Sequence, residues 1–312
     1  SYDAAISNWL VKEKNLESNI HLKTFPFIKN LRYGENPHQK AFFKGDLGNV
    51  FQKLYGKDLS YNNLLDIDSA IKLISEFTSV TFAIIKHNNA CGIASCSSVV
   101  SSYKKALESD PLSAFGGVLI TNQKVDLSSA SEMNNLFFEI LIAPDYDEES
   151  LKILKSKKNR ILLKLKETNF DSVSSKKILG GYLNQDLDVA ENKIKNWKVV
   201  TQKTPSSKNY EDLQFANKIV KHSKSNAIVL VKNSQMISSG VGQTSRVDAL
   251  KHAIEKAKTF GFDIKGSVMA SDAFFPFPDC VEIAADSGIS SIVQPGGSIK
   301  DNLSIEVCNN TD

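Results

Sequence analysis

Short apolar runs alternate with longer amphipathic stretches along this sequence of 312 residues, and this alternation restricts the possible folds more than any other feature. The apolar runs in the first part of the chain are 80–85, 118–120, 140–143 and 160–163. Runs of this length suit buried strands, whereas intervening stretches such as 59–77 and 147–155 repeat their apolar residues at helical spacing. Strands that alternate with helices predict an α/β fold.

A second series of elements follows a polar interruption. Residues 172–210 are polar and weakly periodic, so we place a junction between two subdomains there. After it, the sequence predicts a helix over 210–222 and a hairpin with strands at 227–231 and 236–240. The expected division is a linker helix in 1–24, a first subdomain in 25–195, and a connecting helix with a second subdomain in 196–312.

Charge and cysteine content exclude several classes of function. The formal net charge is +3, and the lysines are interspersed with acidic residues, so the sequence holds no basic stripe for nucleic acid. No apolar run approaches the ~20 residues of a membrane span. The four cysteines are too few for a disulfide scaffold and suit a reducing compartment. We therefore expect a cytoplasmic protein that binds neither nucleic acid nor membranes, and a small-anion pocket stays possible.

The apolar run 80–85 ends abruptly in polar side chains. Lys86, His87, Asn88 and Asn89 follow it directly. Because parallel α/β sheets bind ligands beyond the carboxyl ends of their strands, these residues are candidates for a site. Lys86 and His87 are equally compatible with a solvated polar edge, and the run alone does not decide between the two interpretations.

Two further polar segments lie before and after this run. In 31–39, Arg32 is suited to hold a phosphate or carboxylate through two parallel hydrogen bonds, although the segment also fits a plain surface turn. Asn63, near the start of the predicted helix 59–77, either caps that helix or points its amide into a site. Residues 110–117 end in a pair of glycines, which fits close approach of a ligand to the backbone or simple turn chemistry.

The C-terminal part offers two more candidates. Residues 240–248 combine glycines, hydroxyls and Arg246 at a helix start, a combination that favours anion binding. Ser245 stands where a dinucleotide fingerprint needs its third glycine, and no Walker lysine pattern occurs, so nicotinamide and P-loop sites are not predicted. The three phenylalanines of 270–279 fit either the wall of a flat-ring pocket or a core plug.

Five separated segments together resemble one known family. They read L-R-Y-G-E-N-P-H-Q at 31–39, K-H-N-N-A-C-G at 86–92, D-P-L-S-A-F-G-G at 110–117, G-V-G-Q-T-S-R at 240–246 and S-D-A-F-F-P-F-P-D at 271–279. In this order and over nearly the whole chain, they are similar to the transformylase part of the bifunctional purine-biosynthesis family, 5-aminoimidazole-4-carboxamide ribonucleotide (AICAR) transformylase/IMP cyclohydrolase. The resemblance implies two α/β subdomains like cytidine deaminase, with a helical connecting region.

The resemblance also implies a reaction, the transfer of a formyl group from the cosubstrate 10-formyltetrahydrofolate to the 5-amino group of AICAR in IMP biosynthesis. His87 would shuttle the proton, and Lys86 would stabilise charge or donate a proton near the formyl oxygen and N10. Asn226 would hydrogen-bond the formyl oxygen, and Asp279 would lie beside the pterin and N10 of the folate. No catalytic metal is implied, and whether an alkali cation supports the second subdomain stays open.

Further residues line the nucleotide or folate pocket if the resemblance is carried over position by position. They are Arg32, Tyr33, Asn63, Phe115, Gly116, Glu139, Arg246 and Phe274. The family's active sites form between two protomers, so a homodimer is implied. In that dimer the Lys86 and His87 edge of one chain would meet the region of Asn226, Arg246 and Asp279 in the other.

Three departures limit the resemblance. Ala90 stands where the motif has proline in some members, and Pro278 where others have arginine, which leaves any salt bridge at that position empty. The family also continues past 294–301 to a final strand and an R-x-F-x-H tail that supplies a nucleotide-binding arginine, and it begins with a cyclohydrolase domain. Because this sequence holds neither, we expect a fragment without IMP cyclohydrolase activity, whose opening helix resembles the segment that joins the two domains.

Two rival functions stay open. A zinc-dependent deaminase would share the implied fold, but it needs H-x-E followed by P-C-x-x-C. In this sequence His87 is followed by two asparagines, and Cys91 and Cys96 have the wrong spacing. The other rival is a nucleotide- and folate-binding fragment without turnover, because the family's tail is missing.

Overall fold

The computed structural model describes residues 27–167, 172–190 and 194–311, together with the isolated positions 6, 9, 10, 13 and 14. The linker helix expected in 1–24 therefore lies almost entirely outside the described residues. In the part that is described, no helix is both long and apolar enough to cross a membrane.

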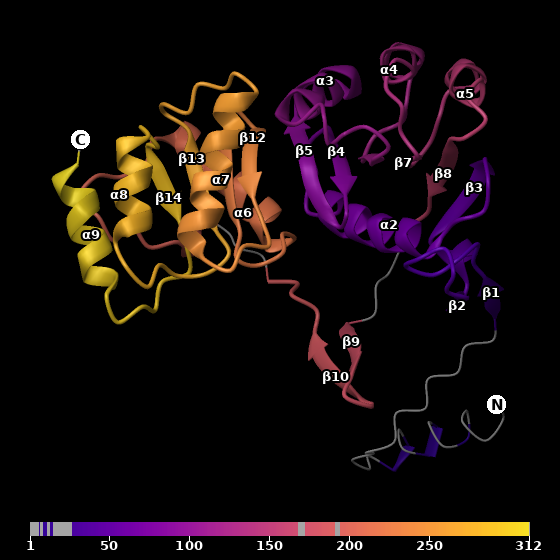
Figure 1. Ribbon diagram of the computed structural model, residues 1–312, viewed down its shortest axis with the longest axis horizontal. Coiled ribbons are helices and arrows are strands. Elements are labelled where there is room, and N and C mark those ends of the chain that lie inside the picture. Colours follow the sequence, from indigo (N-terminus) through magenta and orange to yellow (C-terminus); the bar gives the residue numbers. More distant parts are fainter. Residues whose placement is uncertain are drawn as a thin grey trace.

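Within the described residues, ten strands form one sheet in the order β14-β13-β11-β12-β5-β4-β6-β7-β8-β3. Figure 1 shows its strands as two groups, which meet where β12 pairs with β5. In chain order they are β3 (Phe51–Tyr55), β4 (Thr81–Lys86), β5 (Asn89–Ser95), β6 (Val118–Thr121), β7 (Ile140–Ala143), β8 (Ile161–Leu165), β11 (Ile228–Lys232), β12 (Gln235–Gly240), β13 (Val268–Ser271) and β14 (Ser291–Val293). Strands β6, β7 and β8 run parallel, as do β13 and β14, and the other neighbours are antiparallel. The predicted α/β class is confirmed.

Helices cover both faces of this sheet. They are α2 (Tyr61–Ile74), α3 (Val99–Ser109), α4 (Leu127–Met133), α5 (Glu148–Lys155), α6 (Ser207–Lys221), α7 (Arg246–Thr259), α8 (Asp279–Asp286) and α9 (Asp301–Asn310), with 3-10 turns η1 (Leu47–Asn49) and η2 (Ile194–Asn196). Many begin where the sequence supplies a capping side chain. Ser60, Ser98 and Ser245, for example, each accept a hydrogen bond from the backbone amide three residues ahead.

Two small antiparallel hairpins lie outside the main sheet. One pairs β1 (Ile28–Asn30) with β2 (Phe42–Lys44), and the other pairs β9 (Val173–Ile178) with β10 (Gly181–Asp186). The second hairpin falls within the stretch that the sequence predicts to be irregular. Its strands are mostly polar and exposed, so they lack the apolar alternation that marks a strand, and Leu179 and Gly180 close the turn at positive φ.

The hydrophobic core joins the two ends of the sheet. On one face, α2 and α6 pack on strands of both subdomains in a continuous cluster, in which the rings of Phe77 and Phe215 lie 5.1 Å apart. The opposite face carries two separate clusters, one beneath α3, α4 and α5 and the other beneath α7 and α8. The subdomains therefore share one core layer and keep the other layer apart.

The two subdomains repeat the same order of elements. The series α2-β4-β5-α3-β6-α4-β7 corresponds to α6-β11-β12-α7-β13-α8-β14. We call residues 28–165 the first half and 207–310 the second half. Corresponding residues are 146 positions apart at the start of the opening helix, Tyr61 and Ser207, and at the hairpin turn, His87 and Asn233.

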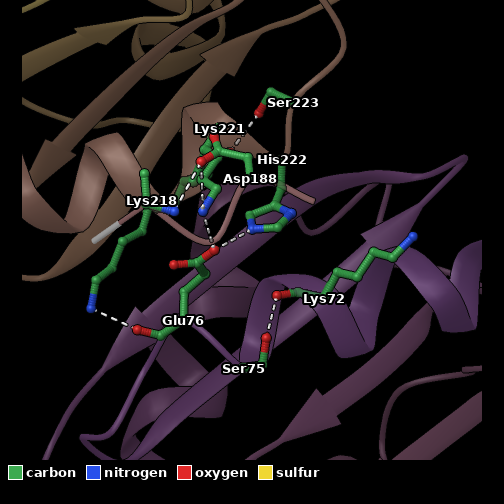
Figure 2. Close-up of polar contacts among 10 residues, drawn as sticks. Lys72, Ser75, Glu76, Asp188, Lys218, Lys221, His222 and Ser223 are labelled. Atoms are coloured by element: carbon green, nitrogen blue, oxygen red, sulfur yellow. Dashed lines mark hydrogen bonds and ion pairs between the residues drawn. The ribbon is translucent and has the colours of Figure 1, made fainter. Parts of the chain in front are cut away.

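Polar contacts tie the halves together beside the shared core (Figure 2). The Glu76 carboxylate lies 2.9 Å from both Lys221 Nζ and His222 Nε2, and Lys218 Nζ donates to the Glu76 carbonyl oxygen at 2.6 Å. Burial opposes ionisation of Glu76, but these hydrogen bonds and charges lower its pKa to about 2. In the sheet itself, β5 and β12 meet at Ala94 and Gln235.

The expectation that the 80–85 run is a strand among parallel neighbours is wrong. Strand β4 is antiparallel to both β5 and β6. The chain turns back directly at His87 and Asn88, which adopt φ values of 50° and 65°, and residues 89–95 form the returning strand. Lys86 thus lies at the carboxyl end of β4 but next to the amino end of β6.

Candidate functional site

The turn between β4 and β5 holds His87 at the edge of the sheet. Asn88 N donates to Asp66 Oδ1 on α2 at 2.7 Å, which fixes the turn to the helix beneath it. Burial raises the pKa of Asp66, and the Asn88 amide and the nearby charges of His87 and Lys86 oppose that rise. A partly desolvated carboxylate thus lies close to the imidazole and the amine that the sequence predicts to act in proton transfer.

Lys86 is directed toward the loop 110–117. Its Nζ donates to the Phe115 carbonyl oxygen at 2.7 Å. Gly116 follows with a φ of 71°, and its amide donates to the Phe137 carbonyl oxygen at 2.8 Å. A Cβ at Gly116 would lie 3.3 Å from Lys86 Nζ, so this position needs glycine both for its backbone conformation and for room beside the amine.

A cationic cluster lies at the same edge. Arg32 Nη2 lies 3.7 Å from Glu139 Oε1, and Lys57 Nζ lies 3.2 Å from the same oxygen. Two cations therefore share one carboxylate, which leaves a net positive charge suited to an anionic group. The Arg32 guanidinium also lies 5.3 Å from the centre of the Tyr33 ring.

Asn63 takes part in capping α2, and its predicted place in a binding site stays a prediction. Its Oδ1 accepts from the Ser60 amide at 3.0 Å, as the partner of the Ser60 cap at the start of α2. The same oxygen lies 3.4 Å from Arg32 Nη2. The helix start therefore holds Arg32 at the site edge.

Arg246 and Phe274, two of the predicted residues of the second half, lie beside Asp272 and the loop that follows it. Arg246 Nη1 lies 2.6 Å from Asp272 Oδ1, and Arg246 Nε donates to the Phe274 carbonyl oxygen at 3.3 Å. Asp272 thus offsets much of the charge of Arg246, and the arginine fixes the loop that carries the half-exposed Phe274 ring. Asn226 Nδ2 donates to the Gln243 carbonyl oxygen at 3.0 Å, and Asp279 begins α8.

Both groups lie along one edge of the ten-stranded sheet. Because β5 and β12 are antiparallel, the carboxyl end of β4 and the amino end of β11 point to the same edge. Asn89 Oδ1 accepts from Lys224 N at 3.1 Å across this seam. Three strand spacings separate β4 from β11, about 14 Å at the usual spacing. That Asn226, Arg246 and Asp279 act with the Lys86 of a second protomer stays a prediction.

Comparison with known proteins identifies the protein family. A model of the AICARFT/IMPCHase bienzyme family matches residues 1–256. The chain belongs to this family. It is 58% identical over 308 residues to the bifunctional purine biosynthesis protein PurH of Bacteroides thetaiotaomicron, which covers 99% of this chain and 60% of that protein.

More distant relatives agree with this membership. The PurH proteins of Prochlorococcus marinus subsp. pastoris and Aquifex aeolicus are 49% and 47% identical, and each match covers 99% of this chain and 62% of the relative. The chain therefore spans about three fifths of the length of these bienzyme relatives. A deaminase/reductase structure from Thermotoga maritima matches 30% of this chain and 33% of its own chain at 22% identity, with a TM-score of 0.19.

Three residues at the site are absent from the predicted set. Asp66 lies three positions after Asn63, so helical spacing places both on one face of α2 and could have revealed it. Asp272 lies inside the S-D-A-F-F-P-F-P-D segment. Lys57 follows β3 without a motif of its own, and only the tertiary contact with Glu139 reveals it.

Proposed function

We propose that this chain transfers a formyl group from 10-formyltetrahydrofolate to the 5-amino group of AICAR, a step of purine biosynthesis. Membership of the AICARFT/IMPCHase bienzyme family supports this choice of reaction. The observation that carries it is the juxtaposition, at one sheet edge, of the Lys86 amine on the Phe115 carbonyl with the neighbouring His87. The cluster of Arg32 and Lys57 beside them suits the phosphate of a ribonucleotide.

The reaction needs one proton to leave the amine and one to reach the folate. The AICAR 5-amino nitrogen attacks the formyl carbon, and the carbonyl oxygen becomes an oxyanion that the Lys86 ammonium stabilises. His87 takes the proton from the attacking nitrogen, and the proton passes to N10 as the bond between the formyl carbon and N10 breaks. Protons and electrons balance without water or an oxidant.

The position of Asp66 suits this use of His87. A carboxylate held near an imidazole stabilises the imidazolium that forms when His87 takes the proton. Burial raises the pKa of Asp66, and the nearby positive charges of His87 and Lys86 act against that rise, as expected for a carboxylate close to both groups. On the folate side, Asn226 would bind the formyl oxygen, Asp279 would lie beside N10, and Phe274 would supply an aromatic wall.

A direct assay tests the proposal. The chain is mixed with AICAR and 10-formyltetrahydrofolate, and formation of tetrahydrofolate is followed by absorbance. We expect turnover that is lost when either substrate is omitted and that depends on His87. A chain that is folded by circular dichroism but shows no turnover at saturating substrates would contradict the proposal.

A second candidate function is binding of the ribonucleotide and the folate without turnover, which the cationic pair of Arg32 and Lys57 also suits. The chain spans about three fifths of the length of its relatives. Calorimetric titration with AICAR separates the two functions, because binding without turnover supports a binding protein and binding with turnover supports the enzyme. Sedimentation of the same sample tests the proposed homodimer.

A further inference from the structure

Lys256 reaches from the second half of the molecule into the first. It lies on α7, and its Nζ is 2.5 Å from Oδ2 of Asp110, the residue that ends α3. The Asp110 side chain is only 2% exposed, whereas the Lys256 side chain is 31% exposed. A surface helix of one half therefore supplies the counter-charge for a buried carboxylate of the other.

Asp110 organises the loop that leads to the candidate site. Its Oδ1 accepts from Ser113 N at 2.9 Å, and its carbonyl oxygen accepts from Ala114 N at 3.2 Å. The turn formed in this way presents the Phe115 carbonyl oxygen, to which Lys86 Nζ donates at 2.7 Å. Lys256 is therefore connected to Lys86 through its ion pair with Asp110, the turn at 110–114 and the Phe115 carbonyl.

Lys256 is the counter-charge on which the buried carboxylate depends. Among the residues that the structure describes, the Lys256 ammonium is the ionic partner of Asp110 Oδ2, at 2.5 Å. Burial alone would raise the pKa of Asp110, but Lys256 and the Ser113 hydrogen bond bring it below the usual value. Removing one partner of such a pair leaves an uncompensated buried charge, which is strongly unfavourable.

We propose that Lys256 is a positioning residue for Lys86. Through Asp110 it fixes the 110–117 loop, and the loop holds the Lys86 amine by the Phe115 carbonyl. Lys256 of the second half thus determines where the Lys86 amine of the first half lies, although the two lysines are connected only through Asp110 and its loop. The kinetic part of this inference rests on the proposed formyl transfer, whereas the structural part does not.

The structural part is tested by hydrogen exchange in the 312-residue chain. We expect Lys256→Met to accelerate exchange of the amides in 112–117 by about tenfold or more, as the loss of a buried counter-charge predicts. Lys256→Arg keeps the charge and is expected to retain protection. Lys251→Met, an exposed lysine on the same helix, serves as the matched control.

A double variant separates charge compensation from general loosening. Asp110→Asn combined with Lys256→Met keeps an oxygen for the Ser113 amide and leaves no buried charge. We expect it to recover protection of 112–117 relative to Lys256→Met alone. Unchanged exchange of this segment in Lys256→Met, or a double variant less protected than that single variant, would overturn the inference.

Kinetics then test the link to Lys86. We expect Lys256→Met to lower kcat about tenfold, to leave the KM for AICAR within about twofold, and to be rescued by Lys256→Arg. A Lys256→Met chain with unchanged kcat, in a protein that turns over, contradicts the positioning role. If the unaltered chain shows no turnover, the proposed function fails, and hydrogen exchange alone decides whether Lys256 orders the loop.

Discussion

The two halves carry hairpin turns of the same construction but with different surroundings. In the first half the turn is His87-Asn88, and in the second half it is Asn233-Ser234; all four residues have positive φ values between 50° and 65°. A lysine precedes each turn. Each turn also donates to an aspartate on the helix beneath it, through one backbone amide in the first half and through two in the second.

The surroundings of the two lysines differ. Lys232 Nζ is enclosed by contacts at 3.1 Å to Asp263 Oδ2 and at 2.7 Å to the Lys265 carbonyl oxygen. Gln235, just after that turn, donates to the Lys105 carbonyl oxygen across the junction of the halves. Lys86 has the Phe115 carbonyl as its hydrogen-bond acceptor and lies beside a glycine instead of a side chain.

The repeated hairpin therefore fixes where each lysine lies, whereas the surrounding loops determine which groups contact it. Both turns present a lysine at a strand end, but at opposite edges of the sheet, because the seam between β5 and β12 is antiparallel. In the second half, neighbouring groups occupy the turn. In the first half, the turn carries an imidazole next to an amine whose hydrogen bond goes to the Phe115 carbonyl oxygen.

The comparison is tested most severely by an equivalent change in each turn. We expect His87→Ala to lower kcat for formyl transfer by about 10²- to 10⁴-fold, the usual contribution of a general acid or base. Asn233→Ala changes the corresponding residue and is expected to leave kcat within about twofold. Steady-state kinetics measure both. Equal losses in the two variants would mean that His87 supports the turn rather than the reaction.

The aspartates beneath the turns provide the next contrast. Asp212 accepts from Asn233 N at 2.9 Å and Ser234 N at 2.7 Å through different oxygens, whereas Asp66 accepts from Asn88 N through one. In Asp212→Asn the amide nitrogen would face a backbone donor, so we expect a loss of about 1–3 kcal/mol in unfolding free energy. Urea denaturation at pH 7 measures it.

The Asp66→Asn variant is expected to lose less than Asp212→Asn, and its effect depends on pH. Because the fold raises the pKa of Asp66, the folded state binds this proton more tightly than the unfolded chain. Wild-type stability therefore falls relative to Asp66→Asn as the pH rises through the folded pKa. A stability difference that moves in favour of wild type as the pH rises would contradict this assignment.

Two glycines test whether crowding at Lys86, and not backbone strain alone, affects catalysis. Each lies two residues before a corresponding strand, β6 in the first half and β13 in the second. Gly116 and Gly266 have φ values of 71° and 76°, but a Cβ meets Lys86 Nζ at 3.3 Å in the first and no atom within 4 Å in the second. Left-handed backbone costs a non-glycine residue about 1–2 kcal/mol, so both alanine variants should lose similar stability. We expect only Gly116→Ala to lower kcat, by about tenfold for a strain of that size. An equal fall in kcat for Gly266→Ala would show that strain alone is responsible.

The smallest expected effect concerns the junction between the halves. The fold lowers the pKa of Glu76 from its usual 4.5 to about 2, through its hydrogen bonds and ion pairs with His222 and Lys221. A lowered carboxyl pKa stabilises the fold above the unfolded value, and this contribution disappears as the pH falls from about 4.5 toward 2. Allowing for screening at this partly exposed group, we expect Glu76→Gln to lose roughly 1 kcal/mol at pH 7.

Chemical denaturation at several pH values measures this effect. The difference between wild type and Glu76→Gln should shrink steadily below about pH 4.5. Lys72→Met, at a lysine on α2 whose ion pair with Asp68 is exposed, is the matched control and should show a smaller pH-dependent difference. A Glu76→Gln difference that stays constant from pH 7 to pH 3 would contradict the lowered pKa.

The sequence predicts local features of this fold better than their arrangement. Apolar runs and caps mark most strands and helices, because burial and helix ends impose their own residue preferences. The direction of β5 is not visible in the same way, since its strand contains glycine, serine and asparagine and depends on a turn at His87 and Asn88. The hairpin β9–β10 lacks an apolar face and escapes detection for the same reason.

The residues of the candidate site are likewise predictable only where the local sequence is distinctive. Residues in dense polar motifs, such as Arg32 and Lys86, are found from the sequence because their chemistry is concentrated locally. Lys57 and Lys256 come from ordinary lysine-containing stretches, and their significance arises from contacts with Glu139 and Asp110 far along the chain. Nothing in local patterning distinguishes them from solvated lysines.

The core layer shared by α2 and α6 has a consequence for how the molecule can be divided. A chain cut in the connection between β10 and α6 would expose the apolar faces of both helices and of the strands beneath them. Neither piece could bury that surface alone, so each should be poorly folded by itself. Mixed together, the two pieces should assemble noncovalently and recover a single cooperative unfolding transition. The connection is thus a place to build a split protein whose reassembly reports on contact between two fused partners.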